Sequence, residues 1–481
     1  MVRIGDIAFL AAVGFLAGVA IADLSFGVLI PALLGVPVLV VWLRHLGCRS
    51  ISRGARIILG IIAAVSAGIF YAHFSAVIRA AGEHYPPARS AFRVLAVSEP
   101  RAAGNYLSFF GELRPPFSGE VSVFIPGGSM LHYGDLVAMT STLSAPLRPN
   151  DPPAVFPKSF AISARGGGSS VMRGAAALRT AGVARFNEWL PNDAAGLLAG
   201  MLFGGAADLD PSLRQEMSAS ETLYVVSLYG YKMGMIMVCL DFFLGDWVPR
   251  IARSVLAAVI GMAMVLLSGG SIAALRAGLA AAMLLAARHA GTAYVPRNGF
   301  AFAAAALAFA DPAAVTGPGF SLTFLSVAGM VSLPAPIRNF LHLGDGRGFF
   351  EWKEAVTVSL ASLLPIVPSI AARSGFFSLA AVPANILMAP AILPGIVLGA
   401  LLAIVPAALP AVTFLVVRAA DAFIQYPLFV IRFFAAHAVP LPFSFSSASS
   451  WLLYFSALML FFFVYRDHPS PTTGRDANPP S

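Results

Sequence analysis

Apolar runs recur along this chain, and they constrain its fold more than any other feature. From Leu223 onward, nine of them follow one another: residues 223–244, 251–268, 272–289, 299–311, 319–333, 354–373, 376–405, 411–438 and 450–465. Only 11% of the 481 residues are charged, whereas soluble domains carry about 25%. We therefore predict an integral membrane protein, a polytopic α-helical bundle of about 10–12 helices. The runs shorter than about 20 residues are expected to be tilted or broken helices.

Three further apolar runs lie near the beginning of the chain, at residues 7–22, 26–43 and 57–78. A basic loop that starts at Arg44 separates the second of these runs from the third. Cytoplasmic loops collect Lys and Arg, so we place this loop and the N-terminus in the cytoplasm. Residues 1–84 are therefore expected to be N-terminal transmembrane helices.

Residues 85–165 have a different pattern, in which Pro, Gly and Asn separate short alternating segments. The segments are residues 92–97, 107–113, 120–125 and 136–142. Alternation with a period of two predicts strands, so we expect a small extracytoplasmic all-β domain. Residues 85–190 carry ten basic and six acidic side chains. This excess either forms a basic groove for single-stranded nucleic acid, beside stacking aromatic rings, or is a solvated surface.

Residues 166–220 are expected to connect this domain to the main bundle. Residues 166–170 have the Gly and Ser composition of a flexible joint. Residues 171–190 predict an amphipathic helix, with arginines on one side and aromatic residues on the other, that can lie in the membrane interface. Asp210 followed by Pro211 is typical of the start of another helix.

Polar side chains are concentrated where the main bundle begins, in residues 221–237 (ETLYVVSLYGYKMGMIM). Six residues of this stretch are candidates for the lining of a path: Tyr224, Ser227, Tyr229, Gly230, Tyr231 and Lys232. Polar groups inside a membrane segment are unfavourable, so they suggest a function. The tyrosines form either an interfacial belt or a surface on which bases stack. Lys232 either reaches the headgroups or supplies the positive charge that a pore for a polyanion needs.

Four polar residues of later apolar runs complete the set of candidates: Arg276, Ser321, Thr323 and Asn385. Arg276 is isolated among apolar residues, and it either faces the path, snorkels to the headgroups or binds a helix C-terminus. Hydroxyls such as those of Ser321 and Thr323 more often bridge helices than contact cargo. Asn385 lies in residues 376–405, whose three prolines predict a broken helix.

No combination of residues indicates an enzyme. The eight histidines are scattered and have no metal-ligand spacing. Residues 166–168 lack the Lys of a phosphate-binding loop, and Ser227 has no nearby His and acid. We therefore expect no catalytic residue, no metal and no cofactor. Residues 466–481 are polar and rich in proline, and we expect them to form a disordered tail.

The order of these parts resembles the ComEC family of competence proteins, which carry transforming DNA through the bacterial inner membrane. Residues 92–160 look like the family's OB-type domain, and LLAGMLFGG at 197–205 looks like the opening of its membrane domain. The most specific match is DPAAVTGPGFSLTFLSVAGM at 311–330. In many members, residues 224–232 read His-Leu-Leu-Ala-Ile-Ser-Gly-Leu-His. Here Tyr replaces the first His and the Ser, and Lys232 replaces the last His.

The resemblance implies that residues 221–465 form an inner-membrane channel, which moves single-stranded DNA into the cytoplasm during natural transformation. The residues singled out above would then line the DNA path. The implied partners are single-stranded DNA, the lipid bilayer, a cytoplasmic DNA-translocating ATPase, a DNA-receptor protein and a separate nuclease. Full-length members often add a C-terminal metallo-β-lactamase-like domain, and we expect this chain to be a short form without it.

An alternative is a polytopic transporter of a small or lipid-linked anionic substrate. Transporters of this kind bind their substrate where discontinuous helices meet near the middle of the membrane. The expected break in residues 376–405, together with Lys232, would suit such a site. This alternative predicts that residues 85–190 have no affinity for DNA.

Overall fold

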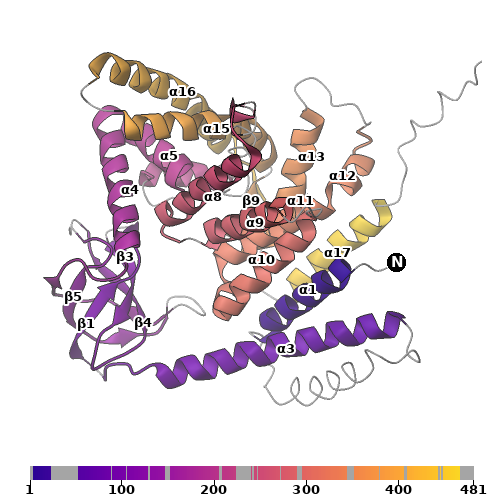
Figure 1. Ribbon diagram of the computed structural model, residues 1–481, viewed down its shortest axis with the longest axis horizontal. Helices are drawn as coiled ribbons and strands as arrows, with labels where there is room; N and C mark the ends of the chain where they lie inside the picture. Colours follow the sequence, from indigo (N-terminus) through magenta and orange to yellow (C-terminus); the bar gives the residue numbers. More distant parts are fainter. Residues whose placement is uncertain are drawn as a thin grey trace, which may run out of the picture. The chain divides into compact units, whose positions relative to one another are not determined.

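The computed structural model describes the following parts of the chain: residues 4–22, 53–87, 89–103, 106–127, 131–146, 152–204, 209–223, 240, 243–245, 247–270, 272–289, 295–343, 352–378, 380–405, 409–441, 445 and 448–465. The chain divides into two compact units, and Figure 1 labels many of their helices and strands. The first unit consists of residues 1–189, 203–208 and 229–317. The second consists of residues 190–202, 209–228 and 318–481.

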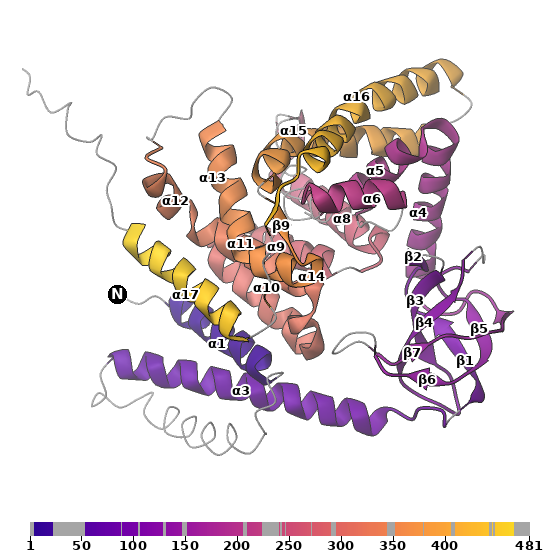
Figure 2. The ribbon, with the colours of Figure 1, turned by 180° about the vertical axis from the view of Figure 1, so that it is seen from behind.

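The first unit combines helices with a β-domain. Its helices are α1 (Ile4–Ala22), α3 (Arg53–Gly82), α4 (Ser170–Trp189), α8 (Arg250–Leu267), α9 (Ile272–His289) and α10 (Pro296–Ala310), followed by the 3-10 turn η2 (Pro312–Thr316). Helix α1 packs against α3 and α10 (Figure 2). Glycines allow the backbones of α1 and α3 to touch, because a Cβ at Gly18 would lie 2.0 Å from the carbonyl oxygen of Val65.

The predicted β-domain is present. Its strands are β1 (Ser90–Ala96), β2 (Arg101–Ala103), β3 (Tyr106–Leu113), β4 (Glu120–Pro126), β5 (Leu136–Ser141), β6 (Leu143–Ser144), β7 (Ala154–Val155) and β8 (Phe160–Ala164). They form one sheet in the order β6-β7-β4-β3-β1-β5-β8, with β2 paired to β3. All these pairings are antiparallel except that of β4 with β7. The four alternating segments of the sequence are thus confirmed as β1, β3, β4 and β5.

The alternation of the sequence explains how the β-domain buries its core. Every second residue of β3 and β5 points inward, and the core residues Val94, Val121, Val123, Ile125 and Val137 are fully buried. Branched side chains of this kind pack well on a pleated surface. The strands are therefore held together by side chains that come from several strands of the domain.

The expected flexible joint at residues 166–170 is wrong, because this segment is bound to the β-domain. The amide of Gly167 donates to the carbonyl oxygen of Gly134 at 2.8 Å. Arg173 donates to the carbonyl oxygens of Gly167 and Gly168 at 2.7 and 2.9 Å. A Cβ at Gly134 would lie 2.4 Å from the oxygen of Gly167, so glycine is needed for close backbone approach. Here glycine serves packing and not freedom of movement.

The amphipathic helix predicted at residues 171–190 is α4, but its arginines are not all on the outer side. Arg179 is only 6% exposed and lies on the buried face with Ala175 and Phe186. The guanidinium of Arg185 lies over the ring of Trp189, 5.2 Å from its centroid. Spacings of three and four residues place side chains on one helix face, which explains why Arg179 shares the face of Phe186.

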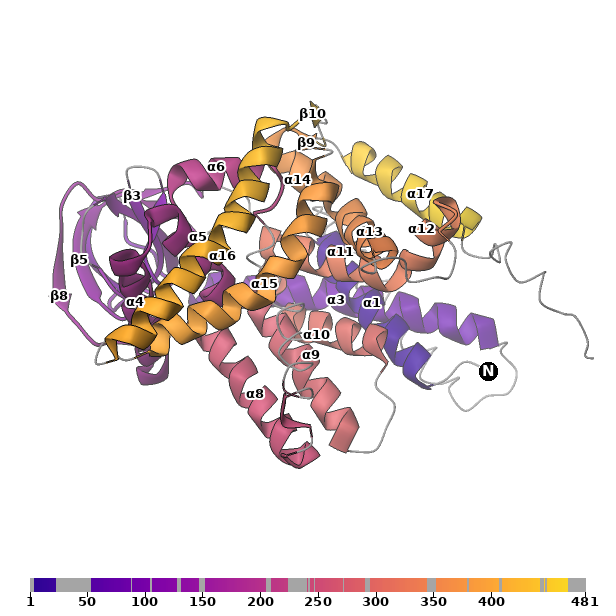
Figure 3. The same cartoon turned by 90° about the horizontal axis from the view of Figure 1, so that it is seen from above.

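The second unit is almost entirely helical. Its elements are α5 (Asn192–Phe203), α6 (Pro211–Ala219), α11 (Pro318–Ser332), α12 (Pro334–Phe340), α13 (Trp352–Leu363), η4 (Leu364–Ile366), α14 (Val367–Ser374), β9 (Phe377–Ser378), α15 (Ala381–Ile404), α16 (Pro410–Ala436), β10 (Pro440–Leu441) and α17 (Ala448–Tyr465). The long helices α15 and α16 pack side by side, as Figure 3 shows. Helix α16 also packs against α6, and β9 pairs with β10.

The break expected in residues 376–405 is wrong, because α15 is continuous from Ala381 to Ile404. Pro390 and Pro394 lie inside it, about one turn apart, so both missing N–H groups fall on the same side of the helix. The hydroxyl of Tyr426 on α16 donates to the carbonyl oxygen of Leu387 at 2.8 Å, in the turn before Pro390. The neighbouring helix thus supports α15 beside its prolines.

A break occurs instead in the run predicted at residues 354–373. Helix α13 ends at Leu363, the 3-10 turn η4 follows, and α14 begins at Val367. Pro365 lies in η4, where it removes a backbone donor and disfavours a helical residue before it. The hydroxyl of Tyr454 on α17 donates to the carbonyl oxygen of Leu364 at 2.6 Å and so satisfies one of the acceptors that the break exposes.

Three helical segments of the described residues are long and apolar enough to cross a membrane: Leu59–Gly82, Ala381–Ile404 and Pro410–Ala436. The other apolar helices, such as Ile251–Leu267 and Ser449–Tyr465, have 10–17 residues. The chain is therefore mostly helical, with candidate membrane spans and a small β-sheet, as the sequence predicts.

Candidate functional site

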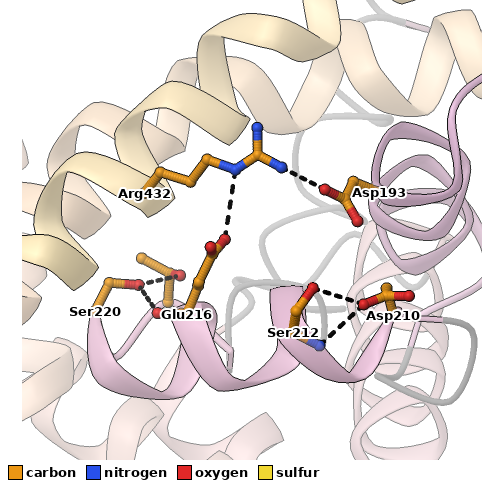
Figure 4. A network of polar contacts seen from close by, with 7 residues as sticks. Asp193, Asp210, Ser212, Glu216, Ser220 and Arg432 are labelled. Carbon is orange, nitrogen blue, oxygen red and sulfur yellow. Dashed lines mark hydrogen bonds and ion pairs between the residues drawn. The ribbon is translucent and has the colours of Figure 1, made fainter.

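The polar stretch that the sequence singles out lies largely outside the described residues. Tyr224, Ser227, Tyr229, Gly230, Tyr231 and Lys232 all belong to the undescribed residues 224–239. The segment that leads into them is described, however. It consists of helix α6 and residues 220–223, and it contains a cluster of polar side chains (Figure 4).

Helix α6 begins where the sequence predicts. Asp210 is its N-cap, and Pro211 occupies the first helical position. The carboxylate of Asp210 accepts hydrogen bonds from the hydroxyl and the amide of Ser212, at 2.6 and 2.9 Å. These bonds favour the ionised carboxylate and hold the pKa of Asp210 below its ordinary value. The helix buries Leu213 and Met217, so its opposite side is free to carry charges.

One of these charges belongs to an ion network that joins three helices. Arg432 of α16 pairs with Asp193 of α5 and, at 3.5 Å, with Glu216 of α6. The exposed fractions of the three side chains are 48%, 28% and 37%. The planar guanidinium presents several donors at once, which is why one arginine can serve two carboxylates. Sequence reasoning missed these residues, although a lone Arg near the end of an apolar helix is a usable signal.

The chain makes a sharp turn where α6 ends. The hydroxyl of Ser220 donates to the carbonyl oxygen of Glu216 at 2.9 Å and lies 2.9 Å from the hydroxyl of Thr222. Glu221, between them, has a φ of 54°, in the left-handed region that non-glycine residues rarely adopt. Ser220 and Thr222 are fully buried. The residues that follow this turn are the predicted path residues.

Glu221 and Asn385 meet at this turn, and each is only 7% exposed. The side-chain amide of Asn385 donates to the carbonyl oxygen of Glu221 at 3.2 Å and to that of Ala381 at 2.6 Å. Burial raises the pKa of Glu221 to about 8, and a hydrogen bond from the backbone of Ser378 acts in the opposite direction. Glu221 lies outside the three candidate spans. A buried carboxyl with such a pKa changes charge within the physiological range.

The remaining predicted residues lie on other helices. Arg276 lies on α9 in the first unit and is 6% exposed. Thr323 donates to the carbonyl oxygen of Phe320 at 3.1 Å, within its own helix α11. Ser321 is on the same helix, and its side chain is outside the described ones. Of the four later candidates, Asn385 is thus the one that joins the α6 turn.

Within the described residues, no three His, Cys, Asp or Glu side chains gather closely enough to hold a metal ion. The acids of the cluster are instead bound to Arg432, to Ser212 or to backbone amides. The chemistry available here is charge pairing and proton uptake.

A comparison with protein families gives an independent result. A family model described as competence protein matches residues 201–468. No curated protein and no solved structure matches the chain. The matched region covers more than half of the sequence and includes α6, the undescribed stretch 224–239 and the helices α15 and α16. This chain therefore belongs to the ComEC family of competence proteins.

Proposed function

We propose that this chain is a multi-pass channel of the bacterial inner membrane, which passes single-stranded DNA into the cytoplasm during natural transformation. The observation that carries the proposal is the competence match over residues 201–468, because this region contains two of the three candidate membrane spans. A family with a role in DNA uptake and helices that can span a bilayer together favour a passage for DNA across a membrane.

The outer surface of the β-domain supports single-stranded DNA as the cargo. Tyr106 and Phe110 on β3, and Phe156 beside β7, are 47%, 48% and 43% exposed. Phe124 on β4 stacks on Phe156, with ring centroids 4.9 Å apart, and Tyr106 meets the same ring at 6.4 Å. Tyr106, Phe110 and Phe124 share one face of the sheet, because their register partners across β3 and β4 alternate with the buried core residues. We name Tyr106, Phe110, Phe124 and Phe156 the aromatic face.

An aromatic face suits unpaired bases, since every base can stack on a ring while duplex DNA keeps its bases covered. The ten basic against six acidic side chains of residues 85–190 add attraction for the phosphates. In this proposal the β-domain is an extracytoplasmic OB-type receiver, and the N-terminus is cytoplasmic. The strand then passes residues 224–232, where Lys232 supplies charge and the tyrosines supply stacking surfaces.

The proposed partners are an ATPase that pulls the strand in the cytoplasm, a DNA-receptor protein and a separate nuclease. The alternative of a small-molecule transporter rests on an expected break in residues 376–405 and on Lys232. Because α15 is continuous, the first of these features is lost, whereas Lys232 lies outside the described residues.

The test compares aromatic and non-aromatic changes on the same sheet. Replacing Tyr106 and Phe156 together (Tyr106→Ala, Phe156→Ala) is expected to weaken binding of a single-stranded oligonucleotide by about fivefold to 150-fold for each ring, because stacking contributes about 1–3 kcal/mol per base. Binding is measured with the full-length protein in lipid nanodiscs, and DNA uptake is measured in cells. Thr140→Ala, at an exposed position of β5, is the control and should leave both unchanged.

Equal oligonucleotide binding by the variant and the wild type would remove the aromatic face from the proposal. Normal DNA uptake by cells that lack the whole protein would remove the function itself. Raising the salt concentration should weaken the binding, because the phosphates release counterions when they meet basic groups.

A further inference from the structure

Two buried oxygen atoms at the α6 turn have no hydrogen-bond donor among the described residues. They are Oε1 of Glu221 and Oδ1 of Asn385. Both residues are more than nine-tenths buried, with 7% of their surface exposed. A buried polar atom without a partner is unfavourable, because it has lost its hydrogen bonds to water. Two such acceptors in contacting residues therefore require an explanation.

The hydrogen bonds around them fix which atoms are left over. The amide nitrogen of Asn385 donates to the carbonyl oxygens of Glu221 and Ala381, and both of these groups can only accept. The amide therefore cannot be turned around, and Oδ1 must remain an acceptor. The carboxyl group of Glu221 accepts a hydrogen bond from the backbone N–H of Ser378. This leaves one acceptor on each side chain.

Among the described residues, no positive charge pairs with Glu221. Strand β9 and helix α15 have no titratable residue. Helix α6 contributes Arg214 and Glu216, and Arg432 of α16 is already shared by Glu216 and Asp193. Arg373 is the charged residue of α14, which contacts β9. Glu221 itself forms no ion pair in the described part of the chain, so an ionised carboxylate there would be both buried and uncompensated.

A proton on Glu221 would remove the buried charge and would also supply the missing hydrogen-bond donor. A carboxylate that binds a proton loses its charge and becomes a donor through its new O–H bond. We infer that Glu221 and Asn385 form a buried proton-binding site, in which the neutral carboxyl group of Glu221 donates a hydrogen bond to Oδ1 of Asn385. The proton comes from solvent and adds to a carboxylate oxygen of Glu221, and no other bond changes.

The site lies between the end of α6 and the stretch that the sequence predicts to meet the cargo. The left-handed conformation of Glu221, its bond to Asn385 and the amide of Ser378 hold this turn to β9 and α15. Loss of the proton leaves a buried carboxylate that has no ion-pair partner among the described residues. The protonation of Glu221 thus sets the stability of the turn.

The sign of the pH dependence follows from the raised pKa, which moves from 4.5 to about 8. The folded protein holds the proton over this range and the unfolded chain does not. The stability that the proton gives is fully present below pH 4.5 and is lost as the pH rises to about 8. Inside this window, each rise of one pH unit lowers the ratio of folded to unfolded protein by about tenfold, because the folded state holds one more proton.

Infrared spectroscopy of the full chain in nanodiscs tests the site directly. The wild type should show the carbonyl band of a protonated, hydrogen-bonded carboxylic acid at pH 6, and this band should disappear as the pH is raised to 9. Glu221→Gln should lack the band and should flatten the pH dependence of Tm. Asn385→Leu should shift the band, since it removes the proposed acceptor. Glu354→Gln, an exposed acid on α13, is the control and should keep both signals.

Absence of the band in the wild type at pH 6 would overturn the proton site, and this outcome needs no variant to fold. At constant pH and ionic strength, replacing potassium by sodium should leave Tm unchanged. A Tm that rises with sodium in the wild type but not in Glu221→Gln would overturn the proton site as well, because a sodium ion would then occupy the place of the proton. Neither readout involves DNA, so the proton site and the proposed channel can fail independently.

Discussion

Glu216 and Glu221 lie five residues apart at the end of α6, and their surroundings are opposite. Glu216 is on the outer side of the helix, is 37% exposed and pairs with Arg432. Glu221 is 7% exposed, has a left-handed backbone and forms no ion pair with any described residue. Figure 4 shows the ion network of Glu216, whereas Glu221 is recognised from its buried Oε1, which has no hydrogen-bond donor among the described residues.

The difference shows that a visible network and an influential residue need not coincide. Exposed ion pairs contribute little, because water already solvates both charges. A buried acid without a cation changes its proton affinity and depends on every group around it. We therefore expect the turn at Glu221 to control stability near α6 more than the network does. Three sets of substitutions test this comparison.

The largest effect is expected at the backbone of Glu221. Glu221→Val places a β-branched side chain at a φ of 54°, whereas Glu221→Gly removes the strain at this position. Val should be less stable than Gly by about 1–3 kcal/mol. Chemical denaturation of the two purified proteins measures the difference. Equal stabilities would mean that the turn does not need its left-handed conformation.

A smaller effect is expected at Asp210, the third acid of this region. Asp210→Ala removes the cap of α6 and should lower Tm by a few degrees, while Asp210→Asn keeps an oxygen that can accept from Ser212 and should lower it less. Thermal unfolding in detergent measures both changes. A fall as large as that of Glu221→Val would contradict the proposed ranking.

The smallest effect is expected at the network in Figure 4. Arg432→Ala should reduce stability by about 0.5–1 kcal/mol, and the loss should shrink at high salt. Arg432→Lys should restore only part of the lost stability, because the compact ammonium group lacks the planar set of donors with which a guanidinium binds two carboxylates. Arg418→Ala, exposed on the same helix, is the control. A loss of several kcal/mol for Arg432→Ala would reverse the comparison.

Local patterns account for the features that sequence reasoning predicted correctly. The alternation of residues 120–125 predicts β4, because each strand residue points to one face or the other regardless of its partners. Asp210 and Pro211 predict the start of α6, since a cap acts on amides two or three residues away. The candidate span Pro410–Ala436 follows from composition and length alone.

The errors occurred where a distant part of the chain decides the outcome. Residues 166–170 have the composition of a linker, but Gly134 and Arg173 bind them to the β-domain. The prolines of α15 predict a break, but the helix continues while Tyr426 of α16 bonds beside Pro390. The composition of a segment indicates its conformation in isolation. It contains no information about which distant residues will form hydrogen bonds with the backbone of that segment.

The sequence alone determined the class of this protein: its apolar runs, its strands and the order of its motifs led to the competence family, which the family match over residues 201–468 confirms. Only the tertiary structure brought Asn385 to Glu221, 164 residues away, and Arg432 to Asp193, 239 residues away. The physical reason is that periodicity and capping act within a few residues, while the partner of a buried acid is chosen by packing.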